Sequence, residues 1–214
     1  MNIFILDNDP VKAAQDQCDK HVVKMIIESA QMLSTVHRML DGKMERRPSK
    51  SGSMLKYYYL EDSREDTLYK ACHHNHPSTV WTRESKANYD WHYKHFVALC
   101  DEYTYRYGKI HMTDTKLRKA LKQVPANIPD IGSTKFKLAM GSNPECIFED
   151  AVKSYRAFYH TKEDRFKWLM KQYDEQMAPE IRASMAKWYG EQNAAKAKYA
   201  EAFEICEYGA QPTE

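Results

Sequence analysis

Residues 18–39, CDKHVVKMIIESAQMLSTVHRM, decide the fold of this chain. One set of positions recurs every three or four residues, as on one face of an α-helix: Val22, Ile26, Ser29, Leu33 and Val36. A second stripe, turned by one residue, is polar and consists of Gln17, His21, Lys24, Glu28, Gln31 and Thr35. Because the remaining flank is apolar, most of this helix is expected to be buried. The polar stripe must therefore face partners, water or a cleft.

The rest of the chain carries mainly helical patterns. Residues 2–6 are a short apolar run, which predicts one strand or a buried extended arm. Asp9 and Pro10 suit the start of a helix that continues to about residue 40, where Asp41 and Gly42 end it. Residues 42–53 are expected to form a mobile basic loop. Further helices are predicted over residues 54–71, 79–107, 114–124, 145–160, 162–173 and 179–206.

These patterns predict an all-α fold, a single compact helical domain with at most a short N-terminal strand. The 214 residues are enough for one core. With only 7 Gly and 8 Pro, a sheet-rich fold with many tight turns is not expected. Within residues 1–214 we expect a core of residues 1–178 and a C-terminal helical appendage of residues 179–214.

The cysteines and the apolar runs indicate the expected cellular location of the protein. The five cysteines are odd in number, widely spaced and without a CxxC pair, which predicts reduced thiols and a cytoplasmic location in a bacterium or a phage-infected cell. The N-terminal sequence MNIFILDNDP lacks the basic and apolar regions of a signal peptide. No apolar run reaches about 18 residues, so no membrane segment is expected.

Three residues of the polar stripe have side chains that can support catalysis. His21 and Glu28 are seven residues apart, about two helical turns, and Lys24 lies between them. A carboxylate in a cleft can act as a general base or stabilise a cationic intermediate, and a lysine can act as a nucleophile. The alternative is a buried ionic network that ties this helix to its neighbours.

The triplet Asp19-Lys20-His21, followed by Glu28, resembles the active helix of the pyrimidine-dimer DNA glycosylases of the T-even phage endonuclease V type. Those enzymes are small and all-helical, and carry an Asp-X-His triplet with a catalytic glutamate seven residues after the histidine. The resemblance covers a short N-terminal segment. It implies that Glu28 is the catalytic carboxylate and that His21 contacts DNA or the opened sugar.

The chain departs from that family at residue 2. The family's nucleophile is the amine of a threonine exposed by removal of the initiator methionine. Here residue 2 is Asn, a large neighbour that usually leaves Met1 in place. An amine at position 1 or 2 can still attack. If the protein has lyase activity, Lys24 is the better-placed amine on this reasoning; otherwise the enzyme is expected to release bases only.

Two segments of the chain are rich in basic residues. Residues 37–56 contain six Lys or Arg against two acids, and residues 105–123 contain six against one. Together they are expected to form one DNA-binding surface, or else they are two separate solvated faces. The residues expected to bind nucleic acid are Lys20, Arg46, Arg47, Trp81, Arg83, Arg106 and Lys109. Trp81 could stack on a base and Arg83 could hold a phosphate; the alternative is an aromatic anchor with a surface ion pair.

No cofactor and no metal are expected. His73, His74 and His76 share one turn, but the HxxxH and HExxH spacings are absent. P-loop, GxGxxG, GxSxG and zinc-deaminase motifs are also absent.

The leading hypothesis is a DNA glycosylase acting on a damaged or modified pyrimidine, with or without abasic-site lyase activity. The whole chain also resembles uncharacterised proteins of large phages, some of which hypermodify thymine. A transferase that modifies thymine in DNA is therefore one alternative. A non-catalytic DNA- or protein-binding helical module is the other.

Overall fold

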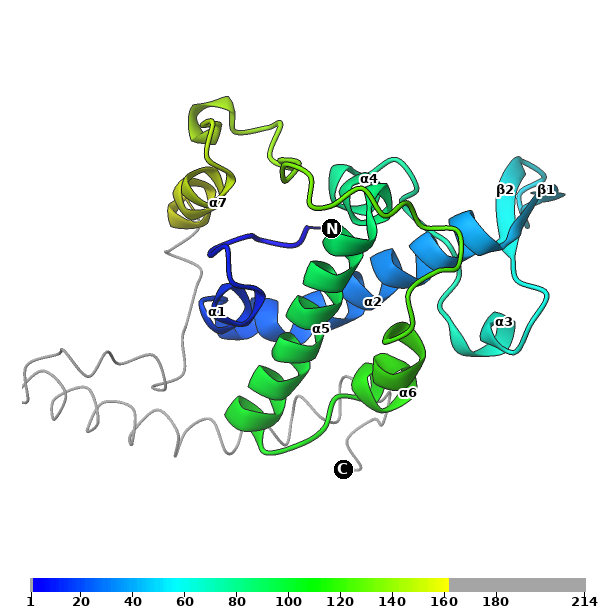
Figure 1. Cartoon of the computed structure of the whole chain (residues 1–214), viewed down its shortest axis with the longest axis horizontal. Helices are drawn as coiled ribbons and strands as arrows, with labels where there is room; N and C mark the ends of the chain where they lie inside the picture. The colour runs from blue at the N-terminus through cyan, green and yellow to red at the C-terminus, as the bar shows by residue number, and fades with distance from the viewer. Residues whose placement is uncertain (1, 162–214) are drawn as a thin grey trace, which may run out of the picture. The chain divides into compact units, whose positions relative to one another are not determined.

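The computed structural model describes residues 2–161 (Figure 1). Its helices are α1 (Pro10–Gln15), α2 (Asp19–Asp41), α3 (Arg64–Thr67), α4 (Pro77–Glu84), α5 (Lys86–Tyr107), α6 (Met112–Leu121), the 3-10 helix η1 (Pro144–Cys146) and α7 (Ala151–His160). Two strands, β1 (Lys43–Pro48) and β2 (Met54–Tyr59), pair with each other.

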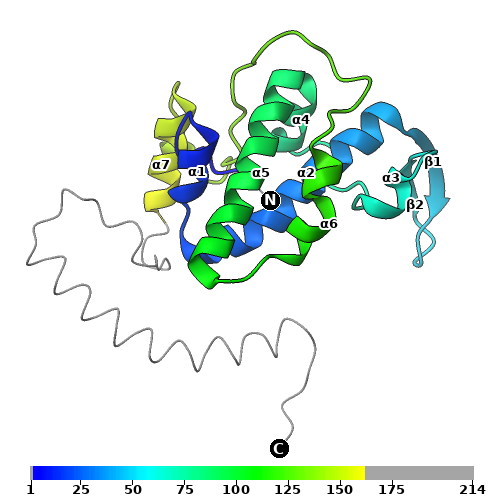
Figure 2. The same cartoon turned by 60° about the horizontal axis from the view of Figure 1, so that its bottom comes forward.

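Helix α2 is the centre of the core, and α4, α5 and α6 pack against it (Figures 1 and 2). The predicted apolar face of α2 is confirmed, because each of its positions is 0% exposed: Val22, Ile26, Ser29, Leu33 and Val36. The predicted helix over residues 79–107 is interrupted at Ser85, which ends α4 and whose side chain accepts a hydrogen bond from the Asn88 amide at the start of α5. Gly108, at φ 70°, ends α5 as predicted.

Residues 2–6 form an extended segment that we call the N-terminal arm. All five residues are buried, and they pair with no strand in the described part of the chain. Phe4 has a positive φ of 56°, a conformation that a large side chain adopts only when its surroundings hold it there. Of the two predicted forms, the arm is the buried extended one.

The prediction of an all-α fold with at most an N-terminal strand is wrong. The chain is mainly helical, but β1 and β2 form an antiparallel hairpin in its middle. This hairpin replaces the predicted mobile loop over residues 42–53 and the first part of the predicted helix over residues 54–71. The physical reason is the segment 57–59, three consecutive tyrosines that favour a pleated strand, after a Ser- and Gly-rich turn in which Gly52 has φ 84°.

Gly42 allows α2 to lead directly into the hairpin. A Cβ atom at this position would lie 2.6 Å from the carbonyl oxygen of Tyr59 and even closer to that of Arg38. Both neighbours are backbone atoms, which cannot move aside as a flexible side chain can. Only glycine at position 42 therefore allows the end of α2 and the end of β2 to pack this closely.

Two histidines of α5 are fully buried and predict acid lability. Burial lowers the pKa of His95 to about 3, and burial together with the nearby His95 lowers the pKa of His92. In the unfolded chain both would titrate near 6.5, so the folded state binds fewer protons below that pH. Stability is fully present above about pH 6.5 and is lost as the pH falls from there toward 3.

We expect the free energy of unfolding in urea to fall by about 1.4 kcal/mol per pH unit for each buried histidine between pH 6 and pH 4. His95→Gln should make this dependence shallower by one such contribution. His73→Gln, at an exposed position of the preceding turn, is the matched control and should leave the slope unchanged. The same pH dependence of the free energy of unfolding in all three proteins would contradict the assignment of this acid lability to the buried histidines.

Several expectations lie wholly or partly outside the described residues. They are the helices over residues 162–173 and 179–206 and the boundary between a core and an appendage at residue 178. Among the described residues, no helix is both long enough and apolar enough to cross a membrane.

Candidate active site

The polar stripe of α2 binds the N-terminal arm. Gln17, just before the helix, donates from Nε2 to the carbonyl oxygen of Ile3 over 3.0 Å. The ring of His21 stacks on Phe4, with 4.5 Å between centroids and 15° between planes. Further along, the Asn2 backbone amide donates to Glu28 Oε2 over 3.2 Å. The arm thus follows the stripe and carries the beginning of the chain to Glu28.

The carboxylate of Glu28 joins two nitrogen groups from different parts of the sequence. Oε2 accepts from the backbone of Asn2, and Oε1 lies 3.2 Å from Lys24 Nζ. The Glu28 side chain is 14% exposed, whereas that of Lys24 is 61% exposed. Glu28 therefore lies at the edge of the core, partly desolvated but within reach of an approaching molecule. Such a position suits a group that must stabilise positive charge.

The position of Asn2 is fixed by its own side chain. Nδ2 donates to the carbonyl oxygen of Ala139 over 3.1 Å, and Oδ1 accepts from the Ile3 amide over 2.9 Å. Asn2 is only 5% exposed. Ala139 is held in turn by Tyr155 of α7, whose hydroxyl oxygen accepts from the Ala139 amide. The beginning of the chain is therefore held in place from two sides, by α2 and by the loop before α7.

The imidazole of His21 is held between α2 and α7. Its Nδ1 lies 2.7 Å from the Tyr159 hydroxyl, and the same hydroxyl oxygen accepts from the Cys18 amide over 3.0 Å. Because the amide fills one acceptor position, the Tyr159 proton can be donated to His21. Burial raises the pKa of Tyr159 and keeps it a neutral donor. With Phe4 stacked on its ring, His21 has a fixed orientation, whatever it contacts on its remaining side.

Of the three predicted catalytic residues, Lys24 and Glu28 are in contact, while His21 contacts Phe4 and Tyr159 instead. His21, Lys24 and Glu28 all lie along the polar stripe, as their spacing requires. Asn2 as a contact of Glu28 and Tyr159 as a contact of His21 were not predicted from the sequence. A single polar residue before an apolar run was a weak signal for Asn2. No local signal identified Tyr159, which is 138 residues from His21.

The residues expected to bind nucleic acid differ widely in exposure. Lys20 is exposed in the first turn of α2, and Arg46 and Arg47 are exposed on β1. Lys109 is half-buried in the turn between α5 and α6. Arg83 is half-buried, and its guanidinium donates to the carbonyl oxygen of His74.

Two of the expected DNA contacts are core residues instead. Trp81 is 1% exposed, packs against Trp91 and Phe136, and donates from its indole to the carbonyl oxygen of Thr134. The Arg106 side chain is 1% exposed and pairs with Asp19 and Glu102. Neither can reach a base or a phosphate in this structure. Trp81 is the aromatic anchor of the alternative interpretation, and Arg106 ties α5 to the start of α2.

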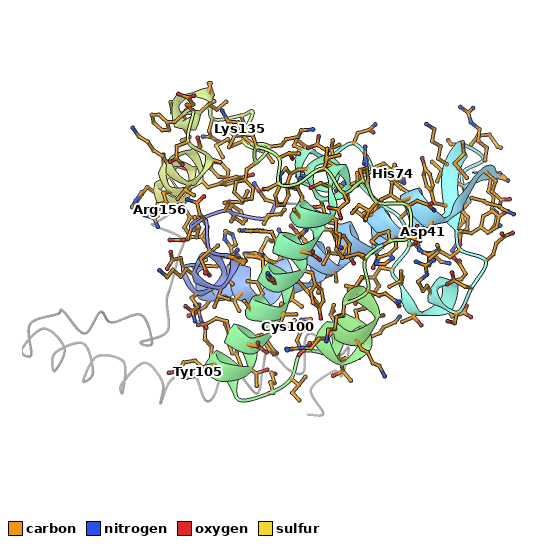
Figure 3. All side chains as sticks on the ribbon, viewed as in Figure 1. Asp41, His74, Cys100, Tyr105, Lys135 and Arg156 are labelled. Carbon is orange, nitrogen blue, oxygen red and sulfur yellow. The ribbon has the colours of Figure 1, made fainter. Side chains whose placement is uncertain are left out.

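The two basic segments lie on different elements. The first runs from the end of α2, beside Asp41, through the hairpin, and the second begins near Tyr105 at the end of α5 and continues through α6 (Figure 3). In the second segment, Arg118 pairs with Asp101 and Asp114, and Arg106 is buried. Lys116, Lys119 and Lys122 of the second segment are exposed, as are the cations of the hairpin. One basic face formed by both segments therefore stays a prediction.

The turn of three histidines has a structural role. His76 caps α4, because its Nδ1 accepts from the Ser78 amide. His74 packs on Tyr58, with 5.0 Å between ring centroids. Among residues 2–161, no group of three or more His, Cys, Asp or Glu side chains is arranged so that it could hold a metal ion.

Comparison of this chain with protein-family models, with curated proteins and with solved structures finds no match.

Proposed function

We propose that this protein is a DNA glycosylase that removes a damaged or modified pyrimidine and uses an amine as nucleophile. One observation supports it most: Glu28 Oε2 lies 3.2 Å from the backbone nitrogen of Asn2. An α-amino group at position 1 or 2 would be within one residue of that nitrogen, and Lys24 Nζ lies 3.2 Å from Glu28 Oε1. Glu28 is therefore next to both candidate amines, and the resemblance of the Asp19-Lys20-His21 helix implies that an amine acts with this carboxylate.

The proposed reaction requires an amine that is partly uncharged. An α-amino group has an ordinary pKa of roughly 7.7–8.0, so a useful fraction is neutral near physiological pH. Its lone pair attacks C1′ of the target nucleotide, and the electrons of the glycosidic bond leave with the base, which takes up a proton. The sugar ring then opens to a protonated imine between C1′ and the amine.

Glu28 has two tasks in this scheme. Its negative charge stabilises the positive charge that develops on the sugar as the base departs. It also accepts the proton that the amine loses on forming the bond to C1′. For lyase activity, a proton leaves C2′ of the imine and the 3′ phosphate is expelled. Hydrolysis of the imine then regenerates the amine.

The amine can be identified by borohydride trapping. We expect the protein to form a covalent adduct with duplex DNA that contains an abasic site or a pyrimidine dimer, because borohydride reduces the imine to a stable secondary amine. An N-terminal extension of several residues should abolish the adduct by moving the α-amino group away from Glu28. Mass spectrometry of the trapped peptide should locate the link at residue 1 or 2.

Lys24→Ala and its matched control Lys94→Ala test the other candidate amine. Both lysines are exposed on helices, but Lys24 contacts Glu28 whereas Lys94 is on α5. Both variants should retain the adduct if the α-amino group is the nucleophile. Loss of the adduct in Lys24→Ala alone would assign the amine to Lys24. Absence of both adduct and base release in the unmodified protein would refute the proposal.

A further inference from the structure

The β1–β2 hairpin extends from the end of α2 as a two-stranded ribbon, opposite the end that carries α1 (Figures 1 and 2). Its strands are joined by residues 49–53, where the Ser49 amide donates to the carbonyl oxygen of Ser53 over 2.8 Å. Every residue of β1 except the half-buried Glu45 is exposed, and so are the first three residues of β2. The ribbon is therefore accessible over most of its length.

The ribbon is strongly basic. Residues 43–59 contain five basic residues and one acid, Glu45, which gives a net charge of +4. Glu45 is already paired with Arg47, which also lies over the ring of Tyr57 at 4.3 Å. Lys43 pairs with Glu61, which follows β2, so the unbalanced charge of the ribbon is that of Arg46, Lys50 and Lys56.

One cross-strand pair is unfavourable in the isolated protein. Arg46 lies directly opposite Lys56, and like charges at paired positions destabilise a hairpin. Within residues 2–161 neither side chain forms an ion pair with an acid. Met44 and Met54, exposed by 51% and 56%, share this face of the ribbon. A partner with regularly spaced anions would relieve the repulsion.

We propose that this ribbon enters a groove of duplex DNA, with the Arg46–Lys56 face toward the phosphates. The major groove admits a two-stranded β-ribbon, and cations on it displace the counterions of the DNA. The exposed methionines then lie against sugars and base edges. The inference rests on the proposed function for the identity of the DNA substrate, but the binding itself does not require catalysis.

The fold sets the position of the ribbon relative to Glu28. Asp41 comes thirteen positions after Glu28 on α2, which corresponds to about 20 Å along the helix. At 3.4 Å per base pair this is roughly six base pairs of duplex. Arg38 fixes the base of the ribbon by donating to the carbonyl oxygen of Tyr58 over 3.2 Å. With α2 aligned along the duplex, the base of the ribbon therefore contacts the DNA about six base pairs to one side of the target nucleotide.

The test compares Arg46→Ala/Lys56→Ala with a matched double variant, Lys12→Ala/Lys94→Ala. All four residues are exposed, and each pair removes two positive charges. Affinity for an undamaged 20-base-pair duplex is measured by fluorescence anisotropy over a range of salt concentrations. The ribbon variant should lower the slope of log affinity against log salt by roughly two units, since each lost phosphate contact removes about 0.9. The control should keep the slope of the unmodified protein.

Equal losses in the two variants, or no loss in the ribbon variant, would overturn the proposal. The second outcome would leave an acidic protein as the better partner for the ribbon. The position of the ribbon on the DNA is tested with duplexes that carry an abasic site and in which the DNA on either side of that site is made progressively shorter. The difference in DNA affinity between the unmodified protein and the ribbon variant should disappear when the DNA on one particular side of the abasic site is shorter than about six base pairs. A difference in affinity that persists when the DNA is shortened on both sides would refute this position of the ribbon.

Failure of this inference is distinguishable from failure of the proposed function. At saturating protein concentration the ribbon variant should still form the borohydride-trapped adduct, because Glu28 and the N-terminal arm are unchanged. If no protein forms an adduct but the ribbon variant loses DNA affinity, the ribbon inference stands and the glycosylase proposal does not.

Discussion

Glu28→Gln should lower the rate of base release by roughly a hundredfold or more. The substitution keeps the shape of the side chain and removes the charge that stabilises the developing cation and accepts the proton of the amine. The bond from the Asn2 amide can persist, because the glutamine carbonyl oxygen is also an acceptor. Single-turnover base release from a duplex with a pyrimidine dimer is the direct measurement.

The same variant distinguishes a catalytic from a structural Glu28. Its ion pair is with a lysine that is 61% exposed, and exposed pairs contribute about 0–1 kcal/mol. The melting temperature should therefore change little, and DNA affinity should be retained. Glu149→Gln, an exposed carboxylate just before α7, is the control for loss of one negative charge. A Glu28→Gln protein of full activity and lowered stability would show that Glu28 only holds the arm.

Arg38→Met should destabilise the protein by about 3–5 kcal/mol. The Arg38 side chain is 0% exposed and donates to the carboxylate of Glu65. It also donates to four backbone carbonyl oxygens, those of Tyr58, Glu65, Leu68 and Tyr69. Methionine fills similar space but leaves all of these acceptors without their donor. The cost is large because buried acceptors lose both water and partner.

The Glu65 carboxylate remains charged in this network. Burial alone would raise the pKa of Glu65, but hydrogen bonds from the Leu60 amide, Lys70 and Arg38 together lower it to about 2. Removing Arg38 takes away one of the three hydrogen bonds that hold this anion, while those from Leu60 and Lys70 remain.

Urea unfolding followed by circular dichroism measures the effect of Arg38→Met. Arg118→Met is the matched control. Its side chain is 37% exposed and pairs with Asp101 and Asp114, so its loss should cost no more than about 1 kcal/mol. Similar losses in the two variants would contradict the central role of Arg38. Because Arg38 fixes the base of the ribbon, its variant should also bind DNA less tightly under conditions where it remains folded.

Local periodicity was enough to predict most of the helices. The apolar face of α2 follows from its spacing alone, since residues three and four apart share a side of a helix. Gly108 ended α5 as expected, because glycine adopts positive φ without strain. The polar stripe was also correctly interpreted as needing partners. A buried helix cannot leave such side chains unsatisfied.

The hairpin was missed because local signals conflicted. Residues 54–71 contain enough charged and long side chains to suit a helix, while the tyrosines at 57–59 favour a strand. The contacts of Arg38 with Tyr58 and the close packing at Gly42 favour the strand. Both depend on residues that the sequence pattern does not place together.

The sequence by itself determined that α2 would carry His21, Lys24 and Glu28 on one stripe, because helical spacing is a local property. Only the tertiary structure decided what this stripe meets: the N-terminal arm, 26 residues before Glu28, and Tyr159, 138 residues after His21. It also placed Trp81 and Arg106 in the core and left the hairpin cations exposed. Burial and pairing depend on packing between distant segments, and no local pattern of residue types specifies that packing.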